Sequence, residues 1–128
     1  MDETLYIAYD SKRNRILVSV EGFDESYIKI FDGPTGDHVI TIGQSDIAVP
    51  KGLCVDPNGN YVVCDTTNYK LLVFDGDNGT LLTSVGKAEG KKYDFGDLYI
   101  TDVCFTVDGE VAVLDGSFDG WGRVQVLA

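Results

Sequence analysis

Short runs dense in β-branched and aromatic residues alternate along the chain with turns built from Gly, Asp, Asn and Pro. Such runs, bounded by turn residues, are typical of β-strands. No segment carries apolar residues at the i, i+3, i+4 spacing of an amphipathic helix over three turns. The pattern therefore predicts an all-β protein whose strands lie near residues 5–9, 15–20, 27–31, 38–42, 52–55, 60–64, 70–74, 80–85, 101–106, 110–114 and 122–127.

The predicted strands form a repeat that occurs three times along the chain. Phe31 and Phe74 are 43 positions apart, and so are Gly43 and Gly86. A period of about 40–50 residues with four short strands per unit is the signature of a β-propeller blade. We expect one segment, residues 1–128, with a first blade near 5–43, a second near 50–86 and a third near 99–128 that lacks its outer strand. The predicted fold is thus a partial propeller of about three four-stranded antiparallel blades.

The second copy of the repeat resembles the NHL repeat through Val55-Asp56, Gly59-Asn60, Asp65, Phe74 and Gly86. The third copy follows the same pattern, and the first is degenerate. The resemblance implies a ring that usually has six blades. It also implies a setting similar to the C-terminal domain of tripartite-motif ubiquitin ligases, which recruits protein or RNA targets. A full-length parent of that kind would be a ligase, although this segment would not itself be catalytic.

Acidic residues outnumber basic ones by 21 to 10, which gives a net charge of −11. A field of that sign repels phosphate backbones, so the charge disfavours RNA and other nucleic acids as partners. The two basic clusters, Lys12-Arg13-Asn14-Arg15 and Lys91-Lys92, are interpreted as solvated turns.

Cysteine usage and hydropathy bear on location. The three cysteines, Cys54, Cys64 and Cys104, form no C-x-x-C pair, and an odd count does not fit a disulfide framework or a zinc site. No apolar run approaches the roughly 18–20 residues that cross a bilayer. We therefore expect reduced thiols, a cytoplasmic protein and no membrane contact.

Residue types that support catalysis are scarce. His38 is the one histidine, and no Gly-x-Ser-x-Gly motif is present. Asp75-Gly76-Asp77-Asn78-Gly79 begins like a calcium loop but has Gly86 where the bidentate glutamate belongs, so a turn is the better interpretation. Asp65 and Asp115, which end the second strands of their blades, are predicted to accept backbone hydrogen bonds from a neighbouring loop. We expect no catalytic, metal-binding or cofactor-binding residues and no cofactor.

Aromatic residues gather in the loops that join second to third strands and one blade to the next, which form the usual recognition face of a propeller. Aromatic side chains often dominate interface energetics. Trp121 is either an exposed anchor or a cover for an adjacent blade. The predicted partner-binding residues on this loop face are Phe23, Asp24, Asn68, Tyr69, Tyr93, Phe118 and Trp121.

Three blades do not close a ring, so their end faces would expose apolar surface that favours association. Two copies joined head to tail would supply about six blades; the alternative is that further blades belong to the same protein. The sequence thus predicts a protein–protein interaction scaffold that self-associates through its blade faces. RNA binding is the alternative function, and a propeller hydrolase or lyase is the third.

Overall fold

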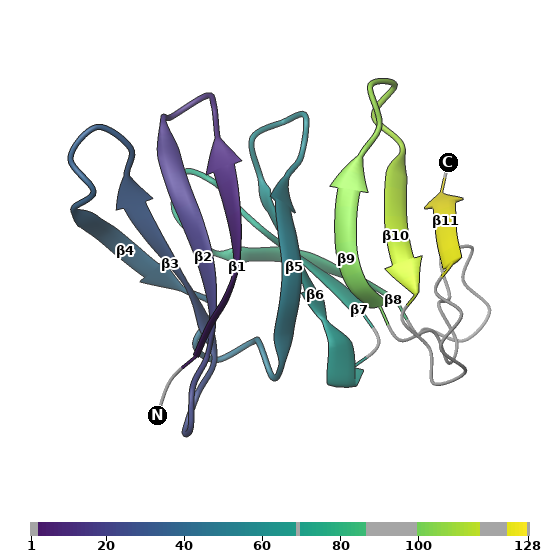
Figure 1. The fold of residues 1–128 in the computed structure, drawn as a ribbon, viewed down its shortest axis with the longest axis horizontal. Coiled ribbons are helices and arrows are strands. Elements are labelled where there is room, and N and C mark those ends of the chain that lie inside the picture. Colours follow the sequence, from purple (N-terminus) through teal and green to yellow (C-terminus); the bar gives the residue numbers. More distant parts are fainter. Residues whose placement is uncertain (1–2, 69, 87–99, 116–122, 128) are drawn as a thin grey trace.

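The computed structural model describes residues 3–68, 70–86, 100–115 and 123–127, and within them the chain folds into antiparallel sheets (Figure 1). Every predicted strand is present, with bounds within two residues of those expected. The elements are β1 (Glu3–Asp10), β2 (Arg15–Glu21), β3 (Tyr27–Asp32), β4 (His38–Ile42), β5 (Pro50–Val55), β6 (Tyr61–Asp65), the 3-10 turn η1 (Thr66–Asn68), β7 (Lys70–Phe74), β8 (Leu81–Gly86), β9 (Ile100–Phe105), β10 (Val111–Asp115) and β11 (Arg123–Leu127).

The strands pair in chain order into three sheets. The first sheet has the order β1-β2-β3-β4, the second β5-β6-β7-β8, and the third β9-β10-β11. The first strands of the sheets, β1, β5 and β9, run side by side in the same direction (Figure 1). Successive meandering sheets arranged in this way are blades of a partial β-propeller, which confirms the predicted fold class.

Turn chemistry fixes the register of each hairpin. In the β5–β6 turn, the Asp56 carboxylate accepts hydrogen bonds from the backbone N–H groups of Asn58 and Asn60, at 2.8 and 2.9 Å. Gly59 has a φ of 82°, a conformation that glycine adopts without steric cost. The Asp-Pro-Asn-Gly sequence therefore closes a tight turn and starts β6 in the correct register.

The second sheet is buried on both faces because it lies between the other two. Alternate residues of a strand point to opposite faces. Tyr61 and Val63 of β6 pack against the first sheet, whereas Val62 and Cys64 pack against the third. All five residues of β6 are consequently buried, including Asp65 at its end.

Two apolar cores hold the three sheets together. The core between the first and second sheets contains Leu17, Ile28, Ile30, Ile42, Ile47, Leu53, Tyr61, Val63, Leu72 and Phe74. The core between the second and third sheets contains Val62, Cys64, Leu71, Ile100, Val103 and Val113. Stability therefore comes from contacts between blades, because each sheet is one layer thick and encloses no core of its own.

Leu72 tests the contribution of the first core. Because its side chain is buried there, we expect Leu72→Ala to lower the free energy of unfolding by about 2–5 kcal/mol through lost transfer energy and an unfilled cavity. Thr83→Ala, on the exposed strand β8, is the matched control and should change it by less than about 0.5 kcal/mol. Urea unfolding measures both, and equal midpoints for the two variants would contradict the assignment of this core.

Candidate binding face

Asp65 organises the loop face, the edge where β2–β3, β4–β5 and β6–β7 connect. Its buried carboxylate accepts backbone hydrogen bonds from Ala48 at 3.2 Å and Val49 at 3.1 Å, in the β4–β5 connection. It also accepts a 2.8 Å hydrogen bond from the side-chain amide of Asn68. Asp65 thus ties the connection between two blades to the end of β6, the structural role that the sequence predicts for it.

Side-chain hydroxyls extend this anchoring between sheets. Ser26, at the base of the β2–β3 loop, donates to the carbonyl oxygen of Ala48 at 3.0 Å, and Thr66 donates to that of Ile100 at 2.8 Å. Both hydroxyl residues are buried. Because Ala48 is held by Asp65, the base of the β2–β3 loop is fixed relative to the second sheet.

An open groove of about 450 Å³ lies beside this loop. Phe23 lines it and is 87% exposed, far more than an aromatic side chain in a packed position. Thr41 and Lys29 are cross-strand partners in β4 and β3, so the sheet itself forms part of the groove. The lining residues are Phe23, Asp24, Glu25, Tyr27, Lys29, Thr41 and Gln44.

The groove combines apolar surface with charge of both signs. Asp24 and Glu25 supply two carboxylates, and Lys29 supplies one cation whose ammonium lies 5.8 Å from the centre of the Tyr27 ring. That separation is a cation–π contact, which orients the lysine along the aromatic face. The lining is more polar than apolar, so a peptide-like ligand would be held by these charges together with the exposed ring of Phe23.

Of the seven predicted partner-binding residues, two line the groove, one lies elsewhere on the loop face, and four lie outside the described residues. The structure brings Phe23 and Asp24 together in the groove. Asn68 is exposed, and its amide is bonded to Asp65. Four of the seven, Tyr69, Tyr93, Phe118 and Trp121, lie outside the described residues, as does the side chain of Asp115.

The loop-based prediction missed the strand residues of the groove, Tyr27, Lys29 and Thr41. A signal for the first two was present, because Tyr27 and Lys29 are two positions apart in one strand and therefore share a face. Thr41 requires the β3–β4 register, in which it lies opposite Lys29.

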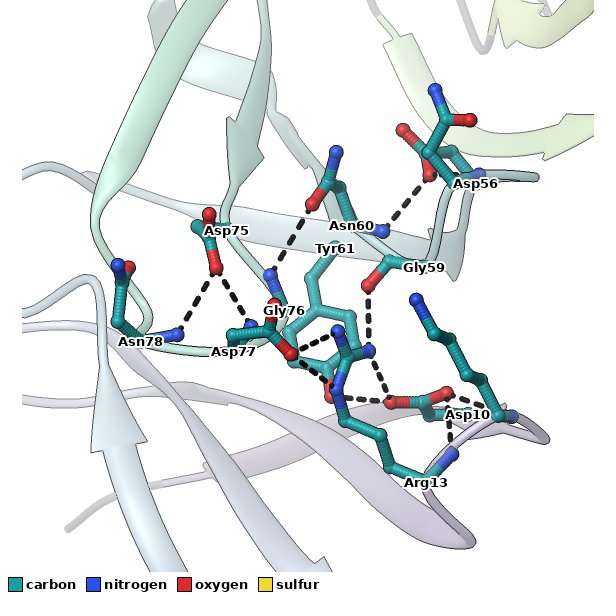
Figure 2. A network of polar contacts seen from close by, with 12 residues as sticks. Asp10, Arg13, Asp56, Gly59, Asn60, Tyr61, Asp75, Gly76, Asp77 and Asn78 are labelled. Atoms are coloured by element: carbon teal, nitrogen blue, oxygen red, sulfur yellow. Dashed lines mark hydrogen bonds and ion pairs between the residues drawn. The ribbon is translucent and has the colours of Figure 1, made fainter.

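A polar network on the opposite edge, at the hairpin turns, was also missed (Figure 2). Arg13, in the β1–β2 turn, donates to Asp10 at 3.0 Å and to the Gly59 carbonyl oxygen at 2.8 Å. It also donates to Asp77, in the β7–β8 turn, at 2.6 Å. The Tyr61 hydroxyl donates to Asp10 at 2.6 Å. We call Asp10, Arg13, Tyr61 and Asp77 the Arg13 network.

The network corrects the interpretation of Lys12-Arg13-Asn14-Arg15 as a solvated turn. The Arg13 side chain is only 13% exposed, and its guanidinium carbon lies 6.0 Å from the centre of the Tyr61 ring. Gly76 permits this approach, because a Cβ there would meet the Gly59 carbonyl oxygen and the guanidinium. The planar, multidentate guanidinium can bond several acceptors at once, which suits it to joining two sheets.

Opposing effects set the ionisation of the network. Burial alone would raise the pKa of Asp10, but the hydrogen bonds from Tyr61 and Arg13 and the charge of Arg13 outweigh it, so its pKa lies below the ordinary value. Burial and the hydrogen bond to Asp10 raise the pKa of Tyr61 to about 12. The ionised carboxylate and the neutral phenol are thus the forms that the fold stabilises.

The network predicts a pH-dependent contribution to stability. Since the pKa of Asp10 is lowered on folding, its contribution is fully present above the ordinary value of 3.8 and is lost as pH falls through the lower folded value. The difference in unfolding free energy between wild type and Asp10→Asn should therefore shrink below about pH 4. Urea unfolding from pH 2 to 7 measures it, with Asp24→Asn as an exposed control; a difference that stays constant would contradict the role of the ionised form.

Tyr61 and Arg13 offer a second test of the same network. Tyr61→Phe removes a donor from a buried carboxylate and should cost about 1–3 kcal/mol of unfolding free energy. Arg13→Ala should also destabilise, and the double variant should show a coupling energy of about 0.5–3 kcal/mol, because both groups bond Asp10. Additive effects of the two substitutions would show that they do not act through that carboxylate.

Within the described residues, no helix has the length and hydropathy that a membrane-spanning helix requires. In the same part of the chain, no three His, Cys, Asp or Glu side chains are grouped in a way that could hold a metal ion.

Comparison with protein families places an NHL repeat at residues 48–74, which run from the β4–β5 connection to the end of β7. No curated protein matches the chain.

Solved structures share the fold at low sequence identity. A chain of hydrazine synthase from Kuenenia stuttgartiensis is similar, with a TM-score of 0.74, 16% identity, and coverage of 96% of this chain and 32% of its own. A chain of a nidogen–laminin complex has a TM-score of 0.67 and 18% identity, and the match covers 98% of this chain and 48% of that one. The Dos1 propeller has a TM-score of 0.68 and 9% identity, and the match covers 94% of this chain and 30% of that one.

The chain therefore spans between about a third and a half of the length of these proteins. At such identities the likeness establishes the fold alone. Residues 48–74 carry an NHL repeat, and the described sheets form an arc of a β-propeller.

Proposed function

We propose that the chain is a protein-binding propeller segment whose loop-face groove receives a segment of a partner protein. The observation that carries this proposal is Phe23, 87% exposed beside the groove on a loop whose base is anchored through Ser26. An anchored loop holds its aromatic side chain at little entropic cost on binding, which is the property of an interface anchor.

The charges of the groove favour a partner segment that is basic and apolar. Asp24 and Glu25 directly follow Phe23 in sequence, so a Lys or Arg of the partner would meet carboxylates next to an apolar contact. The net charge of −11 attracts such a segment at long range and repels the phosphates of RNA. RNA binding is therefore the less favoured function of this face.

The wider setting rests on the resemblance to tripartite-motif ubiquitin ligases. In that setting the chain would be the substrate-recruiting part of a longer ligase and would act in the cytoplasm, where free thiols such as Cys54 and Cys64 stay reduced. The similar structures include both an enzyme, hydrazine synthase, and a chain from a protein complex, nidogen–laminin. Because the fold hosts both roles, the proposal depends on the groove and not on the fold.

We also propose that this segment binds without catalysing a reaction. Its buried carboxylates, Asp10 and Asp65, are engaged by donors that hold turns and connections in place. His38 lies on an outer strand, bonded to Thr41 at 2.8 Å. Burial raises the pKa of Cys54 to about 12, which disfavours the reactive thiolate. The two carboxylates and His38 are thus held in hydrogen bonds, and the Cys54 thiol is kept protonated.

A displayed peptide library that includes basic–apolar, acidic–apolar and neutral sequences tests the proposal. We expect selection on the purified chain to enrich basic–apolar peptides. Phe23→Ala should weaken their binding at least tenfold, because truncation of a central aromatic anchor typically costs about 2 kcal/mol or more. Asp24→Lys should weaken it as well and should reduce its salt dependence.

Val107→Ala is the matched control, because Val107 is a fully exposed apolar residue in the β9–β10 hairpin turn, on the other edge of the sheets. The affinity of the Val107→Ala variant for the selected peptides should equal that of the wild type. Equal affinities for wild type and Phe23→Ala would reject the groove as the binding site. Salt-sensitive binding of single-stranded RNA that Phe23→Ala abolishes would favour the alternative function.

A further inference from the structure

Two loops border the groove of the proposed function, and both lie at the same edge of the sheets (Figure 1). The β2–β3 loop contributes residues 23–25, and the β4–β5 connection, residues 43–49, contributes Gln44. The other lining residues lie on β3 and β4. Sheet pairing fixes these two strands relative to each other, so the shape of the groove depends on where the two loops are held.

The β2–β3 loop is fastened to the β4–β5 connection. Ser26, the last residue before β3, is 3% exposed, and its hydroxyl donates to the Ala48 carbonyl oxygen at 3.0 Å. Phe23 lies three positions before this hydroxyl in the same loop. The place of the loop therefore depends on the segment that leads into the second sheet as well as on its own sheet.

The β4–β5 connection is itself a compact turn. The Gly43 carbonyl oxygen accepts hydrogen bonds from the backbone N–H groups of Asp46 at 3.0 Å and Ile47 at 3.1 Å. Gly43 has a φ of 82°, and a Cβ at this position would meet the Ile47 side chain, so glycine is required there. Ile47 is buried in the core between the first two sheets. Gln44 thus belongs to a turn whose centre is packed in place.

Asp65 lies where the anchorages of the two loops meet. Ala48 accepts the Ser26 hydroxyl through its carbonyl oxygen and donates its N–H to the Asp65 carboxylate at 3.2 Å. The next N–H, of Val49, donates to the same carboxylate at 3.1 Å. Asp65 is fully buried at the end of β6 and is not among the residues that line the groove. Both loops beside the groove are therefore held by one residue of the second sheet.

We propose that Ser26 and Asp65 are positioning residues for the groove, which hold the loops of Phe23 and Gln44 at the spacing that a partner segment requires. This inference rests on the proposed function, because the spacing matters only if the groove binds. A loop that is ordered before binding loses less conformational entropy when the partner arrives. The groove of the first sheet is complete only when the second sheet is packed beside it.

Affinity for the selected basic–apolar peptides is the first measurement. Ser26→Ala removes the donor to Ala48, and Asp65→Asn replaces one carboxylate oxygen by an amide nitrogen that cannot accept a hydrogen bond. Each substitution should weaken binding by about five- to thirtyfold, because one or two loop residues must then be ordered on binding. Calorimetric titration measures this at a temperature at which the circular dichroism of each variant is native.

Thr66→Val is the matched control. It removes another buried hydroxyl that donates to a backbone carbonyl oxygen, that of Ile100 at 2.8 Å, between the second and third sheets. Its side chain holds neither of the loops beside the groove. Thr66→Val should therefore lower the stability as Ser26→Ala does and leave the affinity for the peptides unchanged.

Loop order in the absence of peptide is the second measurement. Backbone order parameters from NMR relaxation at residues 23–25 should be near the value of about 0.85 that is typical of rigid backbone in the wild type and in Thr66→Val. In Ser26→Ala they should fall below about 0.6, the range of flexible segments. This result does not depend on any ligand.

The two measurements separate failure of this inference from failure of the proposed function. If peptides bind and both Ser26→Ala and Asp65→Asn keep the wild-type affinity, the positioning role is overturned and the proposed function stands. If no peptide binds the wild type, the proposed function fails, and unchanged order parameters in Ser26→Ala would overturn the positioning role as well. A loss of affinity in Thr66→Val equal to that in Ser26→Ala would show a general effect of lower stability, and would also overturn it.

Discussion

A four-stranded antiparallel blade has two faces and one layer, so it cannot bury its apolar side chains without a neighbour on each side. The second sheet shows the satisfied case: Val63 points into one core and Val62 into the other, and β6 is buried throughout. The rest of the structure follows from this constraint. Turns, connections and polar networks serve to hold the sheets at the spacing at which these two cores close.

Buried polar groups appear where the sheets need a fixed orientation. Asp65 fixes the connection that leads from one blade into the next, and the Arg13 network joins hairpin turns from two blades. Among the described residues, no buried side-chain nitrogen or oxygen lacks a hydrogen-bond partner, which is the condition for such groups to be tolerated in a core. The same anchoring reaches the surface through Ser26 and sets the place of the β2–β3 loop beside the groove.

The sequence predicted the strands and the blade architecture because both depend on local signals. The turn at Asp56–Gly59 and the period between Phe31 and Phe74 are visible in one copy of the repeat or in a comparison of two. Asp65 was predictable for the same reason. The Arg13 network was not, because its members come from three different hairpins and nothing local distinguishes a solvated arginine from one that bridges blades. The groove was half predicted: Phe23 and Asp24 lie in a loop, whereas Lys29 and Thr41 come together only through sheet register.

The bond between Arg13 and Asp77 joins residues 64 positions apart, in the first hairpin turn of the first sheet and the last hairpin turn of the second. Contacts of such large sequence separation cost much loop-closure entropy and form late, after the local hairpins. The first two blades are therefore expected to open and close as one cooperative unit, whereas the third, held to the second by apolar contacts and the Thr66 hydrogen bond, has a more independent equilibrium. Slow amide exchange would then extend over β2, β3, β6 and β7 together.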